Sequence, residues 1–219
     1  MDSIYSEWFK TDTVTVKVEL VESNDFLTTE EIAELTGAPK NSDIVVSQVD
    51  GIIEFRVSNE IFAEDMYRYL TADVDGFSYH LTNAVLVLKE QYTKMGIGPR
   101  CVIKEIYTAR RLREELPIQQ IRVDAVGDYQ SFHWEKDPLR GYYVWACMGF
   151  DAEIPEAVRP KLPQNYAAKL YISDLMLDKE GREEWLRHGE SVKLAFDLAN
   201  DSVSWKILSG YINERNIEL

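Results

Sequence analysis

The stretch Val85–Leu116, VLVLKEQYTKMGIGPRCVIKEIYTARRLREEL, decides the fold because its hydrophobic period changes in the middle. Residues 85–88 form a continuous apolar run of strand length. From Pro99 onward, apolar residues recur every three or four positions, as they do on one face of a helix. The change of period falls at Gly96-Ile97-Gly98, so the stretch predicts a strand, a glycine turn and an amphipathic helix. The helical apolar positions are Val102, Ile106, Ala109, Leu112 and Leu116.

The glycine turn has the features of an anion site. Pro99 suits the first helical position, because its ring fixes φ and its missing N–H would have had no partner within the helix. Free N–H groups at a helix start attract phosphate, and glycines let a ligand approach the main chain closely. Lys94 and Arg100 flank the turn and add positive charge. The alternative is a tight strand-to-helix connection with no ligand, and a single G-x-G does not distinguish the two.

This stretch, followed by IQQIRVDAV (118–126) and YYVWACMGF (142–150), resembles the GNAT superfamily of acyl-CoA-dependent N-acyltransferases. The resemblance implies an α/β (α+β) fold in which helices flank a mixed twisted sheet. It also implies a turn, Arg/Gln-x-x-Gly-x-Gly/Ala, whose amides hold the coenzyme A pyrophosphate. The Arg/Gln position falls on Thr93, which departs from the family pattern. The acetyl-CoA or other acyl-CoA contacts implied here are Leu88, Lys94, Met95, Gly96, Ile97, Gly98 and Arg100.

The family's proton donor has no direct counterpart. The resemblance implies a tyrosine four residues before the glycine of a Gly-Phe pair, where it protonates the departing thiolate. Here the pair is Gly149-Phe150, and Trp145 stands at the tyrosine position. An indole cannot act as a general acid in the way a phenol can, so Tyr142 and Tyr143 are the candidate acids.

Two residues are candidate bases for the acceptor amine: Glu54, on a predicted hairpin, and His80, at the start of the central strand. For His80 the alternative is a buried, hydrogen-bonded side chain. The three histidines are widely separated, and no H-x-x-x-H spacing places two imidazoles on one helical face. We therefore expect no metal site.

The composition and net charge of the chain argue against some classes of binding partner. The chain has 219 residues, 45% of them hydrophobic, and a formal net charge of −14 from 38 acidic and 24 basic residues. This balance argues against nucleic-acid wrapping and against an anionic membrane surface, and it suits a cationic acceptor such as a small-molecule amine or a basic peptide. Cys101 and Cys147 are too few for a disulfide framework. We expect a cytoplasmic protein without a membrane span; the oligomeric state stays open.

Upstream of the turn, Thr13–Leu20 alternates as a half-buried strand does. Thr28 or Thr29 can cap a short helix that Gly37 ends. Asp50-Gly51 predicts a tight hairpin between residues 44–49 and 52–57.

A helix is expected over Asn59–Leu70, giving a helical insertion near 59–72 within a core domain of residues 1–154. Residues 155–219 are expected to form a mainly helical extension packed on that core, with helices over 165–177 and 181–188, a strand over 192–198 and a final helix after Asp201 or Ser202.

The expected function is transfer of an acyl group from acyl-CoA to an unidentified amine. The alternative is a catalytically inactive GNAT-like binding or structural module that acts through protein partners, since a fold does not guarantee an activity.

Overall fold

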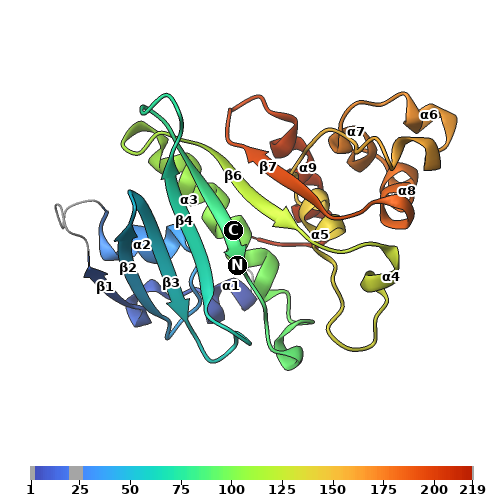
Figure 1. Cartoon of the computed structure of the whole chain (residues 1–219). Coiled ribbons are helices and arrows are strands. Elements are labelled where there is room, and N and C mark those ends of the chain that lie inside the picture. Colours follow the sequence, from blue (N-terminus) through green and yellow to red (C-terminus); the bar gives the residue numbers. More distant parts are fainter. Residues whose placement is uncertain (1–2, 20–26, 219) are drawn as a thin grey trace. The chain divides into compact units, whose positions relative to one another are not determined.

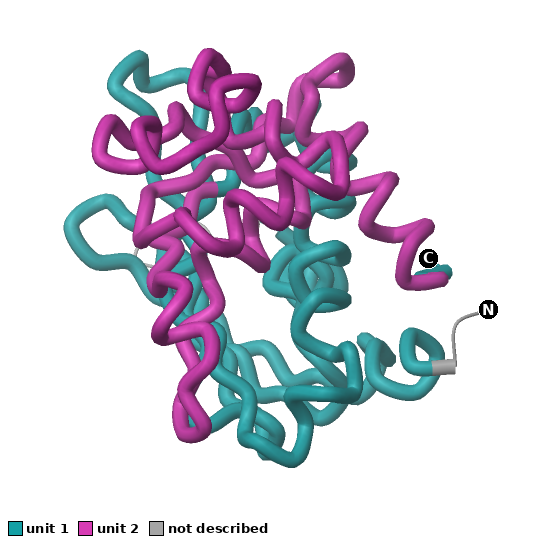
Figure 2. Tube along the Cα trace, turned by 90° about the vertical axis from the view of Figure 1, so that its right-hand side faces the viewer, with its two compact units in different colours: residues 1–121, 217–219 teal, residues 122–216 magenta. Residues whose placement is uncertain are grey.

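The computed structural model describes residues 3–19 and 27–218. Two compact units make up the chain (Figure 2): unit 1, Met1–Ile121 with Ile217–Leu219, and unit 2, Arg122–Asn216. The division falls at Ile121/Arg122, whereas the sequence predicted a boundary after residue 154. The fold is mixed α/β, and each unit is described by itself below.

Unit 1 is a mixed sheet with helices on one face (Figure 1). Strand β1 pairs in parallel with β2, and β2 to β5 follow as an antiparallel meander. Helices α2 and α3 pack against each other on the covered face. The elements are α1 (Ser3–Trp8), β1 (Thr15–Glu19), α2 (Thr29–Leu35), β2 (Asp43–Val49), β3 (Ile52–Ser58), β4 (Met66–Ala72), β5 (Tyr79–Val85) and α3 (Ile97–Arg111), with β6 (Ile118–Ala125) continuing into unit 2.

Local sequence signals set several of these boundaries as expected. Asp50 and Gly51 have φ of 52° and 80°, the two positive values that a tight hairpin between β2 and β3 requires. Thr28 is the N-cap of α2, because its hydroxyl accepts from Glu31 N at 3.2 Å while the Glu31 carboxylate accepts from Thr28 N at 2.9 Å. The hairpin and the capped helix are confirmed. The expected first strand is also present as β1, although Leu20 lies outside the described residues.

The helix expected over Asn59–Leu70 is wrong. Residues 66–72 form strand β4, which pairs with both β3 and β5. The strand's inward positions are Met66, Arg68 and Leu70, all fully buried. Because the middle inward position is an arginine, the segment lacks the alternation of apolar and polar residues that predicts a strand.

Arg68 is buried within a polar network under the sheet. Its Nε donates to Thr36 O at 3.0 Å and lies 3.4 Å from Glu105 Oε1, and its Nη1 donates to Asn83 Oδ1. Asn83 in turn donates to Glu105 Oε2 at 3.0 Å. Burial raises the pKa of Glu105 to about 7, although Arg68 and then Asn83 act to lower it. The network joins β4 and β5 to helix α3.

Of the run 85–88 that was expected as a strand, only Val85 lies in one, and the helix after it begins two residues earlier and ends five residues earlier than expected. Strand β5 ends at Val85, and Leu88 then forms an isolated antiparallel bridge with Phe62. Helix α3 begins at Ile97, two residues before Pro99. The helix is confirmed, and the apolar positions expected to face the core are all buried: Val102, Ile106, Ala109, Leu112 and Leu116.

Unit 2 is mainly helical and has a strongly aromatic core. Tyr142, Phe150, Trp185 and Phe196 are all fully buried within it. The single helix expected over residues 165–177 is interrupted and forms α6 and α7, whereas the helix over 181–188, the strand over 192–198 and the final helix are confirmed with small shifts of their ends. The elements are α4 (Tyr129–Phe132), α5 (Gly141–Cys147), α6 (Gln164–Ala167), α7 (Ile172–Met176), α8 (Lys179–His188), β7 (Val192–Asp197) and α9 (Val203–Glu214).

Among the helices of the described ranges, none combines the length and the apolar character that a membrane crossing requires.

Candidate functional site

The glycine turn before α3 is built from backbone conformations that need glycine. Gly96 is the N-cap residue of α3 and has φ of 72°, in the left-handed region that side chains disfavour. At Gly98, a Cβ atom would lie 3.3 Å from Leu88 Cδ1, which is a tight contact. The two glycines are therefore explained by a close strand-to-helix connection, and the same geometry brings main-chain N–H groups to the start of a 15-residue helix.

The helix start presents donors without acceptors. Ile97 and Gly98 are buried residues, and within residues 3–19 and 27–218 neither N–H has a hydrogen-bond partner. Pro99 contributes no donor. The first N–H groups of any α-helix have no acceptor within the helix, so they bond to a cap, to water or to a ligand. An external acceptor at this point would therefore be stabilised by two N–H groups and by the helix dipole.

Arg100 is hydrogen-bonded to the main chain of the turn. Its Nη1 donates to Gly96 O at 3.0 Å, and Arg100 as a whole is buried. A Cβ on Gly96 would approach that Nη1 to 2.7 Å, so Gly96 and Arg100 share one space. The guanidinium thus holds the turn while placing a positive charge beside the free N–H groups.

The residues before the turn are more exposed. Lys94 and Met95 are exposed, and the Thr93 hydroxyl donates to Glu90 O at 2.8 Å. Beside them lies a surface hollow of about 410 Å³ lined by Glu90, Gln91 and Lys94. Lys94 would favour a phosphate there, whereas the Glu90 carboxylate would oppose one.

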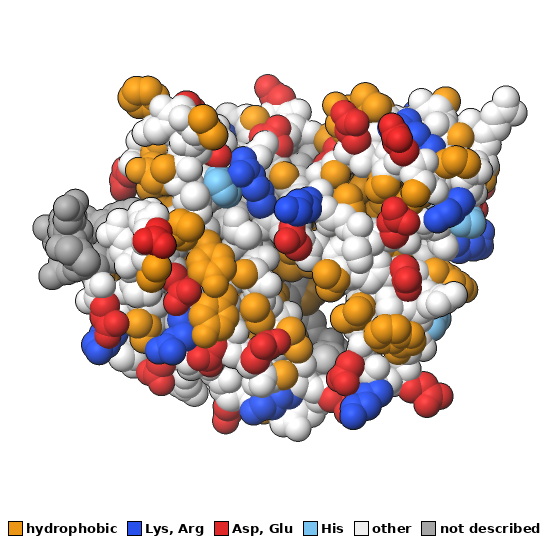
Figure 3. Space-filling model, viewed as in Figure 1, with side chains coloured by type: hydrophobic (Ala, Val, Ile, Leu, Met, Phe, Trp, Pro, Cys, Tyr) orange, Lys and Arg blue, Asp and Glu red, His pale blue; other side chains and the backbone are white. Residues whose placement is uncertain are grey.

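The two candidate bases lie on the same face of the sheet, opposite α2 and α3. Glu54 pairs with Tyr69 on β4, and Tyr69 pairs with Thr82 on β5. His80 pairs with Thr71, two residues further along β4. Strand spacing and rise put the Cα atoms of Glu54 and His80 about 12 Å apart, so they cannot bond to the same proton. Hydrophobic side chains gather over β3 and β4 on this face (Figure 3). Burial, followed by the Glu54 carboxylate, raises the pKa of the Tyr69 phenol.

His80 has a carboxylate partner that the sequence analysis did not identify. Its Nδ1 lies 2.8 Å from Asp73 Oδ1, at the turn between β4 and β5. The two side chains are largely buried, with exposed fractions of 14% and 21%. A carboxylate bound to one ring nitrogen fixes the ring's orientation and favours a base at the other nitrogen.

The candidate acids belong to helix α5 of unit 2. Tyr142 is fully buried, and its hydroxyl donates to Leu186 O at 2.6 Å. Tyr143 is only half-buried; burial and then Cys147 raise the pKa of its phenol to about 12. Trp145 packs edge-on against Phe150. Tyr143 is thus the more exposed of the two phenols.

Among the residues that the structure describes, no group of histidine, cysteine, aspartate or glutamate side chains could hold a metal ion. The remaining histidines have local partners: His133 Nδ1 lies 2.8 Å from Tyr129 O, and His188 lies near Glu184.

Comparison of the chain with protein-family models, with curated proteins and with solved structures finds no match.

Proposed function

We propose that this protein is an acyl-CoA-dependent N-acyltransferase with a GNAT-like fold. The observation that carries the proposal is the start of α3, where the N–H groups of Ile97 and Gly98 have no partner in the described part of the chain. Support comes from the mixed sheet, which ends in a strand leading to this turn, and from the αL conformation of Gly96. These features suit the pyrophosphate of a coenzyme A thioester, since N–H groups at a helix start favour phosphate.

In this proposal Arg100 and Lys94 supply positive charge around the pyrophosphate. The acceptor amine attacks the thioester carbonyl carbon directly, a carbon–nitrogen bond forms, and the thiolate leaves. A base takes one proton from the amine, and His80, oriented by Asp73, is better suited to this role than Glu54. The family resemblance implies a phenol as proton donor to the thiolate, and Tyr143 stays the candidate by its position in the sequence. The chain's net charge of −14 favours a cationic acceptor, such as a small amine or a basic peptide.

A second candidate is a GNAT-like module that binds protein partners without catalysis. The specific observation in its favour concerns Tyr142, one of the two candidate acids. Tyr142 is fully buried, and its hydroxyl donates to Leu186 O. Thr93 and Trp145, at two positions where the family pattern has other residues, point the same way.

Calorimetric titration with acetyl-CoA and with free coenzyme A tests the proposal. We expect both ligands to bind the parent protein and neither to bind a Gly98→Trp variant, because an indole at this position would fill the space beside Leu88 and cover the N–H groups. Acetyl-CoA consumption in the presence of a polyamine or a basic peptide then tests the reaction.

The matched control is Gly210→Trp. Gly210 is exposed in helix α9, and a Cβ there would meet nothing within 4 Å. We expect this variant to bind both ligands as the parent does. A folded parent protein that binds neither ligand would overturn the acyltransferase proposal and leave the partner-binding module. Binding without turnover of any amine would support the module with a retained ligand site.

A further inference from the structure

A fully buried pair of side chains joins the sheet of unit 1 to helix α3. Arg68 on β4 and Glu105 on α3 have no exposed side-chain surface, and Arg68 Nε lies 3.4 Å from Glu105 Oε1. Yet Arg68 Nη2 and Glu105 Oε1 are both buried without a hydrogen-bond partner in the described part of the chain. The two partners of one pair thus keep an unmatched donor and an unmatched acceptor, which is costly because both have given up water.

The other donors of Arg68 are directed to neutral acceptors. Its Nε donates to Thr36 O at 3.0 Å, and its Nη1 donates to Asn83 Oδ1. Glu105 Oε2 accepts from Asn83 Nδ2 at 3.0 Å. A buried carboxylate is stabilised by hydrogen bonds to both oxygens, and its strongest arrangement with an arginine is a two-bond fork. The observed arrangement, in which one oxygen is unused, suits an uncharged carboxyl group.

Thr36 connects this pair to the end of α2. It is the C-cap residue of α2, and the last carbonyl groups of a helix have no donor within the helix. The side chain of Arg68 supplies a donor to Thr36 O from the sheet. Directly after Thr36, Gly37 lies so close to α3 that a Cβ atom on it would be 2.1 Å from Cys101 O. The bond from Arg68 therefore fastens α2 at the place where its end meets α3.

The groups that face Glu105 come from three elements. Burial raises the pKa of Glu105 to about 7, and Arg68 on β4 and Asn83 on β5 oppose the change. Cys101, one turn earlier on α3, is also fully buried, and burial raises the pKa of its thiol to about 12. Glu105 is therefore the group of this cluster that changes its charge near neutral pH.

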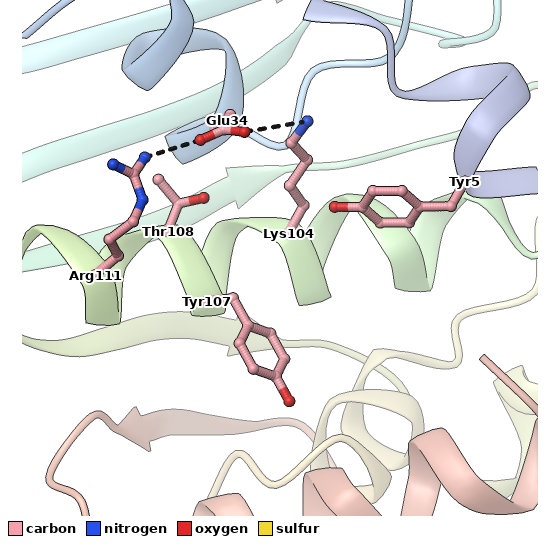
Figure 4. A pocket seen from close by; sticks show the side chains of 6 residues that line it. All are labelled: Tyr5, Glu34, Lys104, Tyr107, Thr108 and Arg111. Carbon is pink, nitrogen blue, oxygen red and sulfur yellow. Dashed lines mark hydrogen bonds and ion pairs between the residues drawn. The ribbon is translucent and has the colours of Figure 1, made fainter. Parts of the chain in front are cut away.

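Other charged side chains of α2 and α3 form a separate cluster (Figure 4). Lys104 Nζ lies 3.8 Å from Glu34 Oε1, and Arg111 Nη2 donates to Glu34 Oε2 at 2.8 Å. These contacts hold α2 to α3 whatever the charge of Glu105 is. A change at Glu105 therefore acts on the end of α2 and leaves the rest of that helix attached.

We propose that Glu105 is a proton-operated switch that decides which acceptor Arg68 binds. With Glu105 protonated, Arg68 Nε donates to Thr36 O, as in the structure. When Glu105 gives its proton to solvent, the guanidinium turns, Nε and Nη2 donate to the carboxylate, and Thr36 O loses its donor. This switch goes beyond the proposed acyl transfer and does not depend on it.

NMR titration of the isotope-labelled parent protein between pH 5 and pH 9 tests the switch. The carboxyl carbon of Glu105 reports its charge, and the scalar coupling between Arg68 Nε and the Thr36 carbonyl carbon reports their hydrogen bond. We expect both to change with one midpoint near pH 7, so that the coupling falls to about one tenth of its low-pH value at pH 8. Glu105→Gln should keep the coupling at every pH. Glu115→Gln, at an exposed glutamate after α3, is the matched control and should titrate as the parent does.

A coupling that persists while the Glu105 signal titrates would overturn the proposal, because Arg68 would then keep its acceptor. So would a coupling that is lost at the same pH in Glu105→Gln, or a Glu105 side chain that holds one charge state throughout the range. The parent titration alone can give the first and the third of these results, so the test stands even if Glu105→Gln does not fold.

Discussion

Substitution of Glu105 by glutamine should stabilise the protein at alkaline pH. Glu105 is fully buried, and burial raises its pKa from 4.5 to about 7 in spite of Arg68. Glutamine keeps the acceptor oxygen that Asn83 Nδ2 uses, at 3.0 Å in the parent protein, but it carries no charge. The substitution therefore removes the cost of ionising a buried carboxyl group while it keeps the hydrogen bond.

The sign and size follow from linkage. Because the folded-state pKa is higher than the unfolded one, the stability that Glu105 contributes is complete below pH 4.5 and is lost as pH rises through 7. At pH 8 this loss amounts to about 3 kcal/mol, and at pH 5 to about 1 kcal/mol, from a shift of two to three pKa units. The free energy of unfolding of the Glu105→Gln variant should thus exceed that of the parent by about 1 kcal/mol at pH 5 and by about 3 kcal/mol at pH 8.

Urea unfolding of the parent and the variant at pH 5, 6, 7 and 8 measures this difference directly, because all other titrating groups are common to both proteins. A variant that loses stability relative to the parent as pH rises would refute the reasoning. That result would mean that the ion pair with Arg68 outweighs burial and that the folded-state pKa of Glu105 lies below its usual value.

Two further predictions concern a close helix contact and the candidate acids. Gly37→Ala should lower the free energy of unfolding by about 2–5 kcal/mol, because Gly37 has φ of 64° and a Cβ there would lie 2.1 Å from Cys101 O. Gly51→Ala is the comparison: Gly51 has φ of 80°, but a Cβ there would meet nothing within 4 Å, so the cost should be only about 1–2 kcal/mol. Urea unfolding measures both. Equal costs would contradict the close packing of α2 on α3. If the protein is an acyltransferase, Tyr143→Phe should lower kcat about 100-fold, and Tyr142→Phe should leave kcat unchanged while it lowers stability by about 1–2 kcal/mol; the opposite pattern of kcat would move the acid to Tyr142.

Features governed by neighbouring residues could be predicted from the sequence. The hairpin at Asp50-Gly51 and the Thr28 cap depend on residues no more than three positions apart, and both are present. The helix after the glycine turn was also predictable, since its apolar period spans four turns. Its first residue was not, because Gly96 can adopt the αL conformation that starts the helix before Pro99.

Features governed by distant partners could not be predicted. Strand β4 was taken for a helix because Arg68 occupies an inward position, where its partners Thr36, Asn83 and Glu105 are all distant in sequence. The carboxylate partner of His80 is seven residues away in sequence, across a turn that brings the two together. The ion pair of Lys104 on α3 with Glu34 on α2, at 3.8 Å, likewise joins residues far apart in sequence.

Helix α3 buries several polar side chains. Arg100, Lys104, Glu105 and Thr108 are all buried on one 15-residue helix. Apolar residues of similar volume would bury the same helix at lower cost, since a buried polar group stabilises only when it is fully paired. Three of them have partners within unit 1: Arg100 Nη1 donates to Gly96 O, Lys104 Nζ lies 3.8 Å from Glu34 Oε1, and Glu105 Oε2 accepts from Asn83 Nδ2.

The buried polar groups of α3 act at two places along the helix: Arg100 holds the glycine turn at its start, and Glu105 pairs with Arg68 of β4 in its middle. If the two places are independent, Gly98→Trp should abolish coenzyme A binding, whereas Glu105→Gln should leave coenzyme A binding unchanged while it alters the pH dependence of stability. A folded Glu105→Gln variant that loses coenzyme A binding would show that α3 transmits the change from its middle to its start.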